Sequence, residues 1–145
     1  MSDAPLPVPQ TFADLGLPES LLKALSEVGY ESPSPIQAAT IPPLLANRDV
    51  LGQAQTGTGK TAAFALPILA KLQPLARAPQ ALVLAPTREL AIQVHESVKT
   101  YSKHVPIRSC CVYGGVDIKA QIAEIRCRKT WGSPAQTTVF VRGIE

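Results

Sequence analysis

The sequence LGQAQTGTGKTAAF, Leu51–Phe64, places three glycines within eight residues and follows the last one directly with lysine and threonine. An apolar run precedes this stretch, and an apolar helical pattern follows it. A glycine-rich loop between a strand and a helix can turn its backbone N–H groups around an anion, and the helix start adds partial positive charge. The stretch therefore predicts a phosphate-binding loop.

Individual residues of this loop suit the parts of a bound nucleotide. Lys60 would reach the β- and γ-phosphates, and the Thr61 hydroxyl would ligate Mg²⁺. Gly57 and Gly59 let the backbone approach phosphate oxygens where a Cβ would clash. The general pattern G-x-x-x-x-G-K-[ST] has glycine where this chain has Ala54. The general pattern is thus incomplete, and a flexible turn before a helix is the plain alternative.

The loop lies within an alternation of short apolar runs and helical patterns. The runs cover residues 49–54, 81–86 and 107–113, and the helical patterns cover 59–73 and 88–103. Strand, helix, strand, helix, strand is the order of a parallel sheet. The second run, ALVLA, is apolar at every position, as expected of a strand covered on both faces.

Glycines and prolines predict where the other helices begin and end. A helix is expected over Leu15–Val28, with Gly29 as its C-terminal cap. Pro35 can open a short helix that Pro42-Pro43 should interrupt, and Pro67 predicts a kink or break in the helix after the loop.

The composition indicates one globular domain and gives no argument for nucleic-acid binding. Of the 145 residues, 46% are hydrophobic and 17% are charged, which makes wholesale disorder implausible. Up to Ile125 the chain holds ten Lys/Arg and ten Asp/Glu. The net charge of +3 therefore comes entirely from the last twenty residues and describes no binding face on the rest.

The chain shows no sign of a membrane or secretory protein. It has no apolar span of 18 residues, and its start lacks a basic and an apolar signal region. Three cysteines, including adjacent Cys110 and Cys111, make no disulfide framework and are expected to be buried small hydrophobes in a reducing cytoplasm.

The stretch GYESPSPIQ, Gly29–Gln37, offers a way to read the base of a nucleotide. A glutamine amide presents one donor and one acceptor, which match the N6 donor and N7 acceptor of adenine. Guanine presents acceptors at both places and would be rejected. Taken alone, Gln37 could equally be an ordinary surface or capping glutamine.

Four motifs in one order carry a resemblance to a known family. They are GYESPSPIQ (29–37), AQTGTGKT (54–61), PTRELAIQ (86–93) and YGG (113–115). Together they resemble the N-terminal part of a DEAD-box RNA helicase of bacterial type, in which Ala54 is the family's own form of the loop. Phe12 stands 17 residues before Gly29, where the family carries an isolated aromatic. The resemblance runs from about Phe12 to Ile125.

The resemblance implies a fold and a nucleotide site. The fold would be an α/β, RecA-like P-loop NTPase lobe, an incomplete one, with a parallel sheet flanked by helices. The ligands would be ATP and Mg²⁺. Gln37 would read adenine, and Phe12 or Tyr30 could stack on its ring. The phosphates would be held by Thr56, Gly57, Thr58, Gly59, Lys60 and Thr61, with Thr61 also contacting Mg²⁺.

The resemblance also implies contacts to RNA. Pro86, Thr87, Arg88 and Glu89 at a helix start, and the Gly114-Gly115 turn, would bind its sugar-phosphate backbone. Such contacts carry no sequence information, so RNA binding should be indifferent to sequence. Each residue also has a plain alternative: Thr87 could only cap its helix, Arg88 could only pair with a carboxylate, and the glycines could only end a strand.

The family pattern continues with elements that this sequence does not contain. They are a strand, a Thr-Pro-Gly-Arg motif, an Asp-Glu-Ala-Asp box, a Ser-Ala-Thr motif and a second domain. We therefore expect a flexible lead-in at 1–11, a partial helicase domain at 12–125, and an anomalous basic tail at 126–145 that suggests a reading-frame change near Cys127. The chain alone is expected to lack hydrolytic activity.

Three functions follow, in decreasing order of support. The first is an ATP-dependent RNA helicase, with ATP hydrolysis coupled to RNA unwinding, of which this chain carries the ATP-binding part. The second is a non-catalytic nucleotide-binding remnant. The third, an unrelated P-loop enzyme such as a small-molecule kinase, would leave 29–37 and 86–93 unexplained. The sequence gives no expectation for the oligomeric state.

Overall fold

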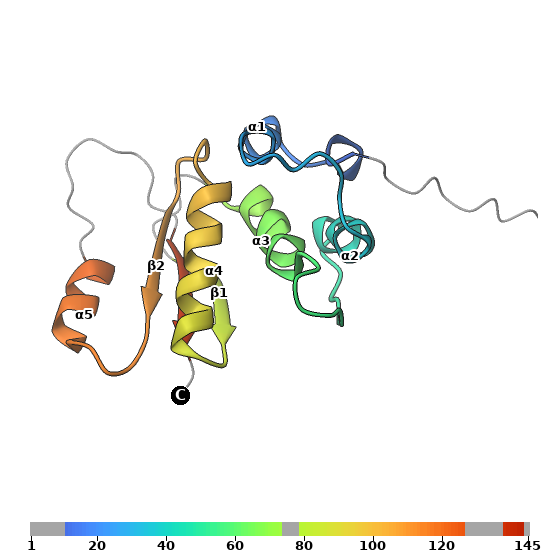
Figure 1. The fold of residues 1–145 in the computed structure, drawn as a ribbon. Coiled ribbons are helices and arrows are strands. Elements are labelled where there is room, and N and C mark those ends of the chain that lie inside the picture. The colour runs from blue at the N-terminus through green and yellow to red at the C-terminus, as the bar shows by residue number, and fades with distance from the viewer. Residues whose placement is uncertain (1–10, 74–78, 127–137, 144–145) are drawn as a thin grey trace, which may run out of the picture. The chain divides into compact units, whose positions relative to one another are not determined.

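The computed structural model describes residues 11–73, 79–126 and 138–143 (Figure 1). It divides into two compact units, Met1–Ala70 and Lys71–Glu145. The predicted lead-in at 1–11 lies, apart from Thr11, outside the described residues. Within the described part of the chain, no helix has the length and apolar character needed to cross a membrane.

The first unit is helical. Its elements are a 3-10 helix η1 (Ala13–Leu15) and three α-helices, α1 (Glu19–Glu27), α2 (Pro35–Leu45) and α3 (Lys60–Lys71), the last of which ends one residue into the second unit. The predicted helix at 15–28 therefore begins later than expected. Gly16 has a φ of 80°, and Pro18 is extended, so the chain turns between η1 and α1.

Gly29 ends α1 as predicted. It has a φ of 80°, a conformation that glycine adopts without steric cost. The Gly29 N–H donates to the Ser26 carbonyl at 3.1 Å, and the Tyr30 N–H donates to the Leu25 carbonyl at 2.9 Å. These two bonds form a Schellman motif, which fixes the direction in which the chain leaves the helix.

The prolines interrupt the helices less than predicted. The prediction that Pro42-Pro43 interrupts α2 was wrong, because the helix runs through both residues to Leu45. Both prolines lie in the last turn, where their carbonyls still accept bonds from the N–H groups of Ala46 and Arg48 at 3.1 and 3.0 Å. Pro67, fully buried, likewise does not break α3.

The predicted strand at 49–54 does not form. These residues are assigned neither strand nor helix, and Leu51 is 91% exposed. A strand is stabilised by hydrogen bonds to a neighbouring strand, and in the described ranges 11–73, 79–126 and 138–143 no strand pairs with this segment. Apolar patterning alone therefore does not make a strand here.

The second unit is a parallel α/β structure. Its elements are β1 (Pro79–Ala85), α4 (Arg88–Tyr101), β2 (Arg108–Val112), α5 (Ile118–Arg126) and β3 (Thr138–Gly143). The strand order is β1-β3-β2, and β3 pairs in parallel with both neighbours. The predicted strands at 81–86 and 107–113, and the parallel arrangement, are confirmed.

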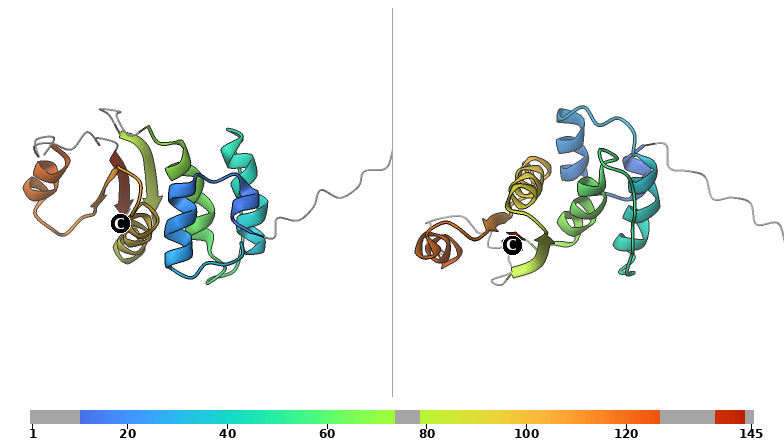
Figure 2. Two further views of the ribbon diagram at one scale, coloured as in Figure 1. Left: turned by 90° about the horizontal axis from the view of Figure 1, so that it is seen from above. Right: turned by 60° about the horizontal axis from the view of Figure 1, so that its bottom comes forward.

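Helix α4 packs along one face of this sheet and contacts all three strands (Figures 1 and 2). Its apolar face is buried through Ala91, Val94 and Val98. Leu82 and Leu84 of β1 point to the other face and are 62% and 56% exposed. The expectation that this strand is covered on both faces was therefore wrong for the described residues.

The strand β3 was not expected. The sequence predicts no strand within 126–145, yet Thr138–Gly143 forms the central strand of the sheet, between β1 and β2. The sequence TVFVRG is rich in β-branched and aromatic residues, which favour strands. Residues 127–137 and 144–145 of the predicted tail lie outside the described residues, and the reading-frame change stays a prediction.

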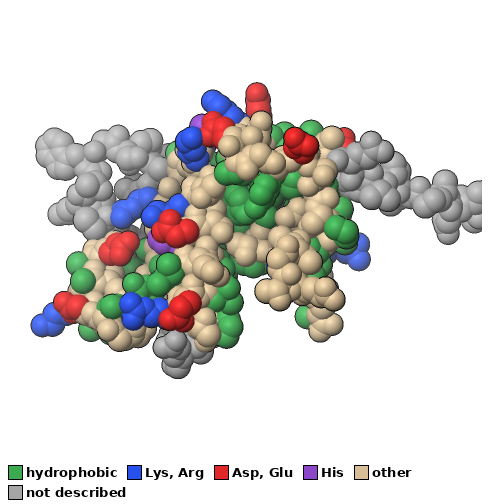
Figure 3. All heavy atoms as spheres, viewed as in Figure 1, with side chains coloured by type: hydrophobic (Ala, Val, Ile, Leu, Met, Phe, Trp, Pro, Cys, Tyr) green, Lys and Arg blue, Asp and Glu red, His purple; other side chains and the backbone are tan. Residues whose placement is uncertain are grey.

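Charges are mixed on the face of the molecule shown in Figure 3. On the face shown in Figure 3, Lys and Arg side chains lie interspersed with Asp and Glu, and neither sign forms a continuous patch. This distribution agrees with the balanced count of acidic and basic residues up to residue 125. Any anion site must therefore be built from local geometry.

Candidate functional site

The glycine-rich loop, Ala54–Thr61, leads directly into α3 in the first unit. Lys60 is the first residue of that helix. Gly57 and Gly59 have φ values of 79° and 81°, in the left-handed region that favours glycine. The loop therefore ends at a helix N-terminus, where unpaired backbone N–H groups and the helix dipole favour an anion.

Two side chains at the start of α2 hold this loop. The Ser34 hydroxyl donates to the Thr58 carbonyl at 2.8 Å, and the Gln37 Nε2 donates to the Gly59 carbonyl at 3.1 Å. The two residues also form the capping box of α2, in which the Ser34 N–H donates to the Gln37 Oε1 at 2.9 Å. The N-terminus of α2 and the loop are thus joined through hydrogen bonds.

Gln37 combines the capping role with a possible role in reading a base. It is 4% exposed, and each end of its amide makes one hydrogen bond to the protein. An amide nitrogen carries two donors and an amide oxygen two lone pairs, so one donor and one acceptor remain. These are the two groups that adenine pairing requires.

Lys60 and Thr58 stabilise the loop from within. The Lys60 Nζ donates to the Ala54 carbonyl at 2.8 Å, and the Thr58 Oγ1 donates to the Gln55 carbonyl at 2.7 Å. The Lys60 side chain thus lies back against the loop that it follows, and the residue is exposed. Its ammonium could reach an anion by exchanging the Ala54 bond or through one of its two other N–H donors.

Phe12 and Tyr30 form a stacked pair beside α1. Their ring centroids lie 6.2 Å apart with an interplanar angle of 19°. Phe12 is 4% exposed, whereas Tyr30 is 41% exposed. Tyr30 therefore offers more free ring surface for a base than Phe12 does.

The described residues offer few side chains that could ligate a metal ion. Among residues 11–73, 79–126 and 138–143, no group of three or more His, Cys, Asp or Glu side chains could hold one. Thr61 is half-buried in the first turn of α3 and offers a hydroxyl oxygen, a hard ligand of the kind that Mg²⁺ accepts. Because Mg²⁺ usually keeps waters and phosphate oxygens as ligands, a single protein hydroxyl fits nucleotide-bound Mg²⁺.

The residues predicted to contact RNA lie in the second unit at the start of α4 and at the end of β2. The Thr87 Oγ1 accepts a hydrogen bond from the Leu90 N–H at 3.2 Å, so Thr87 caps α4. Pro86, Thr87 and Glu89 are exposed, and Glu89 lies in the first turn, where its charge suits the helix dipole.

Arg88 and the double-glycine turn lie next to each other. The Arg88 guanidinium carbon lies 4.6 Å from the centroid of the Tyr113 ring, a cation–π contact. Gly115 has a φ of 79°, and a Cβ built there would lie 3.9 Å from the Arg88 Nη1. Gly114 and Gly115 are both exposed. The structure thus brings the two predicted RNA-contacting segments together.

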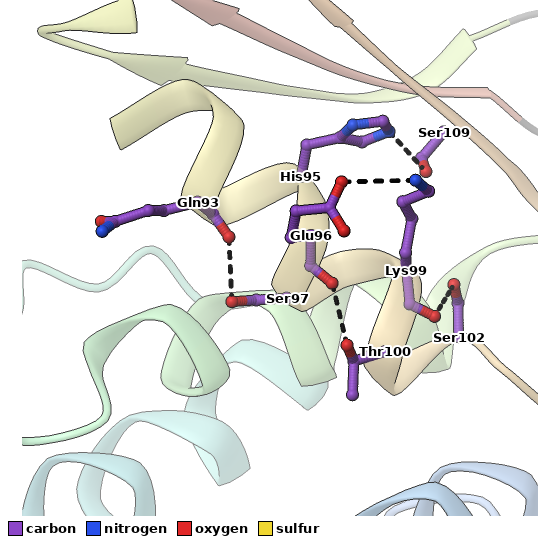
Figure 4. Close-up of polar contacts among 8 residues, drawn as sticks. All are labelled: Gln93, His95, Glu96, Ser97, Lys99, Thr100, Ser102 and Ser109. Atoms are coloured by element: carbon purple, nitrogen blue, oxygen red, sulfur yellow. Dashed lines mark hydrogen bonds and ion pairs between the residues drawn. The ribbon is translucent and has the colours of Figure 1, made fainter. Parts of the chain in front are cut away.

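The polar contacts drawn in Figure 4 lie within α4 or at its C-terminal end, except for one from His95 to Ser109 of β2. Lys99 and Glu96 form an exposed ion pair at 3.3 Å, and His95 Nε2 lies 3.0 Å from the Ser109 Oγ of β2. Burial raises the pKa of the Cys110 thiol from 9.0 to about 11, with a further contribution from the negative charge of Glu124. Cys110 is thus buried as predicted, whereas Cys111 is only half-buried and Cys127 lies outside the described residues.

Two residues of this arrangement did not stand out in the sequence. Ser-x-x-Gln at 34–37 is the pattern of a capping box, but that pattern does not predict the hydrogen bond from Ser34 to the loop. Gln121 hydrogen-bonds the backbone N–H and carbonyl of Tyr113, and no pattern of neighbouring residues in the sequence predicts that contact.

Comparison with known proteins gives one consistent result. Residues 34–142 match the family described as DEAD/DEAH box helicase. The chain is 57% identical over 117 residues to ATP-dependent RNA helicase DeaD of Escherichia coli, covering 80% of this chain and 19% of that protein. It is 50% identical over 135 residues to ATP-dependent RNA helicase DeaD of Haemophilus influenzae, covering 91% and 22%.

Solved structures resemble the chain over most of its length. One is Saccharomyces cerevisiae Dbp5 bound to RNA and ADP BeF3, with a TM-score of 0.76 and 35% identity over 92% of this chain and 32% of that one. Another is a DEAD box protein from Methanococcus jannaschii, with a TM-score of 0.80 and 31% identity over 92% and 34%. The chain spans about a fifth of the length of the curated relatives that it matches.

Proposed function

The chain belongs to the DEAD/DEAH box helicase family, and we propose that it supplies the ATP-binding and RNA-contacting part of an ATP-dependent RNA helicase. Its fold is the RecA-like one of that family. The observation that carries the proposal is the joining of α2 to the glycine-rich loop through Ser34 and Gln37. It places an amide suited to adenine next to a loop suited to phosphates.

The base would be recognised from the α2 side of the loop. The remaining donor and acceptor of Gln37 would pair with adenine, and the exposed face of Tyr30, supported from behind by Phe12, would stack on the ring. Guanine would present two acceptors to this amide and leave its oxygen unpaired inside a nearly buried site. We therefore propose ATP as the nucleotide.

The phosphates would be bound by the loop residues Thr56–Thr61. The backbone N–H groups at the start of α3 would face the phosphate oxygens, and Lys60 would exchange its bond to Ala54 for one to the β- and γ-phosphates. Thr61 would hold Mg²⁺, which supplies charge neutralisation on the phosphates when it is bound. The chain's own contribution is to orient the phosphates and offset their charge.

RNA would be bound through its phosphates by the second unit. Arg88, the N–H groups at the start of α4, and the bare Gly114-Gly115 turn all present donors to an anion. Dbp5, which this chain resembles, is bound to RNA in its structure. Because these donors address the sugar-phosphate backbone, we propose that binding is indifferent to RNA sequence.

Nucleotide competition tests the adenine site. Labelled ADP bound to the chain should be displaced by ATP at far lower concentrations than by GTP. Gln37→Ala should abolish that preference, whereas Gln93→Ala, which truncates an exposed glutamine of α4, should keep it. Equal displacement by ATP and GTP from the unaltered chain would contradict the proposal.

A second measurement separates a helicase part from a nucleotide-binding remnant. We expect the chain to bind nucleotide and single-stranded RNA but not to hydrolyse ATP by itself, since an Asp-Glu pair that orients the attacking water does not occur in the sequence. ATP hydrolysis stimulated by RNA in this chain alone would contradict that expectation. Nucleotide binding without any RNA binding would favour the remnant.

A further inference from the structure

The side chain of Gln121 holds the backbone of Tyr113 at both polar atoms. The Tyr113 N–H donates to the Gln121 Oε1 at 2.9 Å, and the Gln121 Nε2 donates to the Tyr113 carbonyl at 3.0 Å. Both bonds are part-buried and join residues eight apart in the sequence. Gln121 is therefore bonded to the backbone as a neighbouring strand would be.

Tyr113 needs such a partner because of its place in the sheet. It is the first residue after β2, an edge strand whose pairing with β3 ends at Val112. The ladder hydrogen bonds therefore stop one residue short of Tyr113. Gln121 lies in the first half of α5. The Asp117 carboxylate caps the start of this helix by accepting a hydrogen bond from the Lys119 N–H at 2.9 Å. The helix thus supplies the bonds that the sheet does not.

The backbone fixed in this way carries two groups of the RNA-contacting site. The Tyr113 ring lies under the Arg88 guanidinium at 4.6 Å, and the Gly114-Gly115 turn begins at the next residue. A released Tyr113 would let both the ring and the turn move. The guanidinium of Arg88 would then lose the surface that sets its plane beside the turn.

We propose that Gln121 is a positioning residue for the RNA contact: it holds the Tyr113 backbone so that Arg88 and the Gly114-Gly115 turn meet one RNA phosphate as a unit. This inference rests on the proposed RNA binding by the second unit. Gln121 acts through Tyr113 and touches no RNA itself. The ligand class is the phosphodiester backbone of single-stranded RNA.

A different role would also produce the two hydrogen bonds. Gln121 could serve only to attach α5 to β2, in which case its loss would lower stability without a specific effect on Arg88. The two roles differ in how the losses from Gln121 and Arg88 combine. Positioning predicts that they overlap, and attachment predicts that they add.

The test is a double-mutant cycle on the whole chain, with a fluorescein-labelled ten-nucleotide oligo(U) as the probe. Gln121→Ala should weaken binding about 5- to 10-fold, Arg88→Ala by at least as much, and the double variant by clearly less than the product of the two losses. The slope of log affinity against log salt should fall by about one phosphate contact in Arg88→Ala, and by part of that in Gln121→Ala.

Two further variants keep the test decisive. Gln121→Glu can still accept from the Tyr113 N–H, but its carboxylate would face the Tyr113 carbonyl oxygen and add negative charge beside the phosphate contact, so it should bind oligo(U) at least as weakly as Gln121→Ala. Gln93→Ala, on the exposed side of α4, is the matched control and should bind normally. Labelled ADP affinity should be unchanged in every one of these variants, and circular dichroism with urea denaturation checks that the second unit stays folded.

Three outcomes would overturn the inference. Normal oligo(U) binding by Gln121→Ala would do so, and so would losses that multiply in the double variant with an unchanged salt slope. If the unaltered chain binds ADP but no oligo(U), the proposed RNA binding itself fails and this inference with it. The first two outcomes leave the proposed function standing, so the two failures are distinguishable.

Discussion

The glycine-rich loop and the start of α4 are held in place in different ways. Both present backbone N–H groups at a helix start. In the first unit the loop is held by side chains from α2, more than twenty residues earlier in the sequence. In the second unit the start of α4 follows a strand of a hydrogen-bonded parallel sheet, and its own Thr87 caps it. The position of the loop therefore depends on a few side-chain atoms, and the position of the start of α4 depends on the backbone hydrogen bonds of the sheet.

This difference predicts different responses to perturbation. The loop should lose function when a single side-chain bond or a single glycine is changed, because the neighbouring segment 49–54 forms no strand to support it. The start of α4 should tolerate the loss of a single local side-chain bond, such as the Thr87 cap, since it follows a strand of the hydrogen-bonded sheet. The Gly114-Gly115 turn lies beyond the strand pairing and depends on Gln121 instead. Three measurements test this contrast.

The largest expected effect concerns the sheet. Cys110 of β2 is 5% exposed, and burial raises the pKa of its thiol from 9.0 to about 11. The thiolate is the reactive form, so at pH 8 its fraction should be about 100-fold lower than in the unfolded chain. Alkylation of Cys110, followed peptide by peptide with mass spectrometry, should be at least that much slower in the folded chain than in urea.

The same shift fixes the direction of the pH dependence. The folded Cys110 thiol keeps its proton to a higher pH than the unfolded thiol, so its contribution to stability is complete below pH 9.0 and is lost as the pH rises toward about 11. Alkylation of the folded chain should keep accelerating over that range. Equal rates for folded and unfolded Cys110 at pH 8 would show that the sheet opens readily and would remove the contrast.

The second measurement compares two glycines of the loop. Both have left-handed φ values, but a Cβ on Gly59 would collide with the Gln37 Nε2, whereas a Cβ on Gly57 would meet no atom within 4 Å. Gly57→Ala should cost about 1 kcal/mol of backbone strain, or roughly fivefold in ADP affinity, besides the clash of a Cβ with phosphate oxygens that both variants share. Gly59→Ala should cost about 2–3 kcal/mol, or roughly 30- to 150-fold, because it also displaces the Gln37 amide.

Labelled ADP titrations of the two variants, with circular dichroism as the check on folding, measure this difference. If both glycines lose affinity equally, the contact between Gln37 and the loop does not matter for nucleotide binding. The loop would then be held by its own backbone, as the start of α4 is.

The contrast also explains what could be predicted from the sequence. The start of α4 at Arg88 and the end of α1 at Gly29 depend on local patterns, so a cap and a glycine were enough to place them. The loop was recognised from its glycines for the same reason. Local spacing is visible in a sequence because the interacting atoms lie a few residues apart.

The failures depend on partners that lie far away in the sequence. Residues 49–54 have the composition of a strand, but a strand also needs a neighbour, and composition does not supply one. Thr138–Gly143 found two neighbours and became the central strand of the sheet, although its surroundings looked anomalous. The bonds of Gln121 to Tyr113 likewise depend on how α5 packs beside β2, which no short pattern encodes.

The smallest expected effect uses the same substitution in both units. Ser34→Ala removes the hydroxyl that donates to the Thr58 carbonyl, and Ser109→Ala removes the hydroxyl that hydrogen-bonds His95. Each bond contributes about 1 kcal/mol, so each variant should be slightly less stable in urea denaturation. Only Ser34→Ala should also weaken ADP binding, by roughly fivefold, because only that hydroxyl holds the loop.

Equal ADP affinity in the two variants would mean that the α2 side chains contact the loop without fixing its conformation. Weaker ADP binding in Ser109→Ala would mean that the sheet, too, transmits the loss of a single side-chain bond.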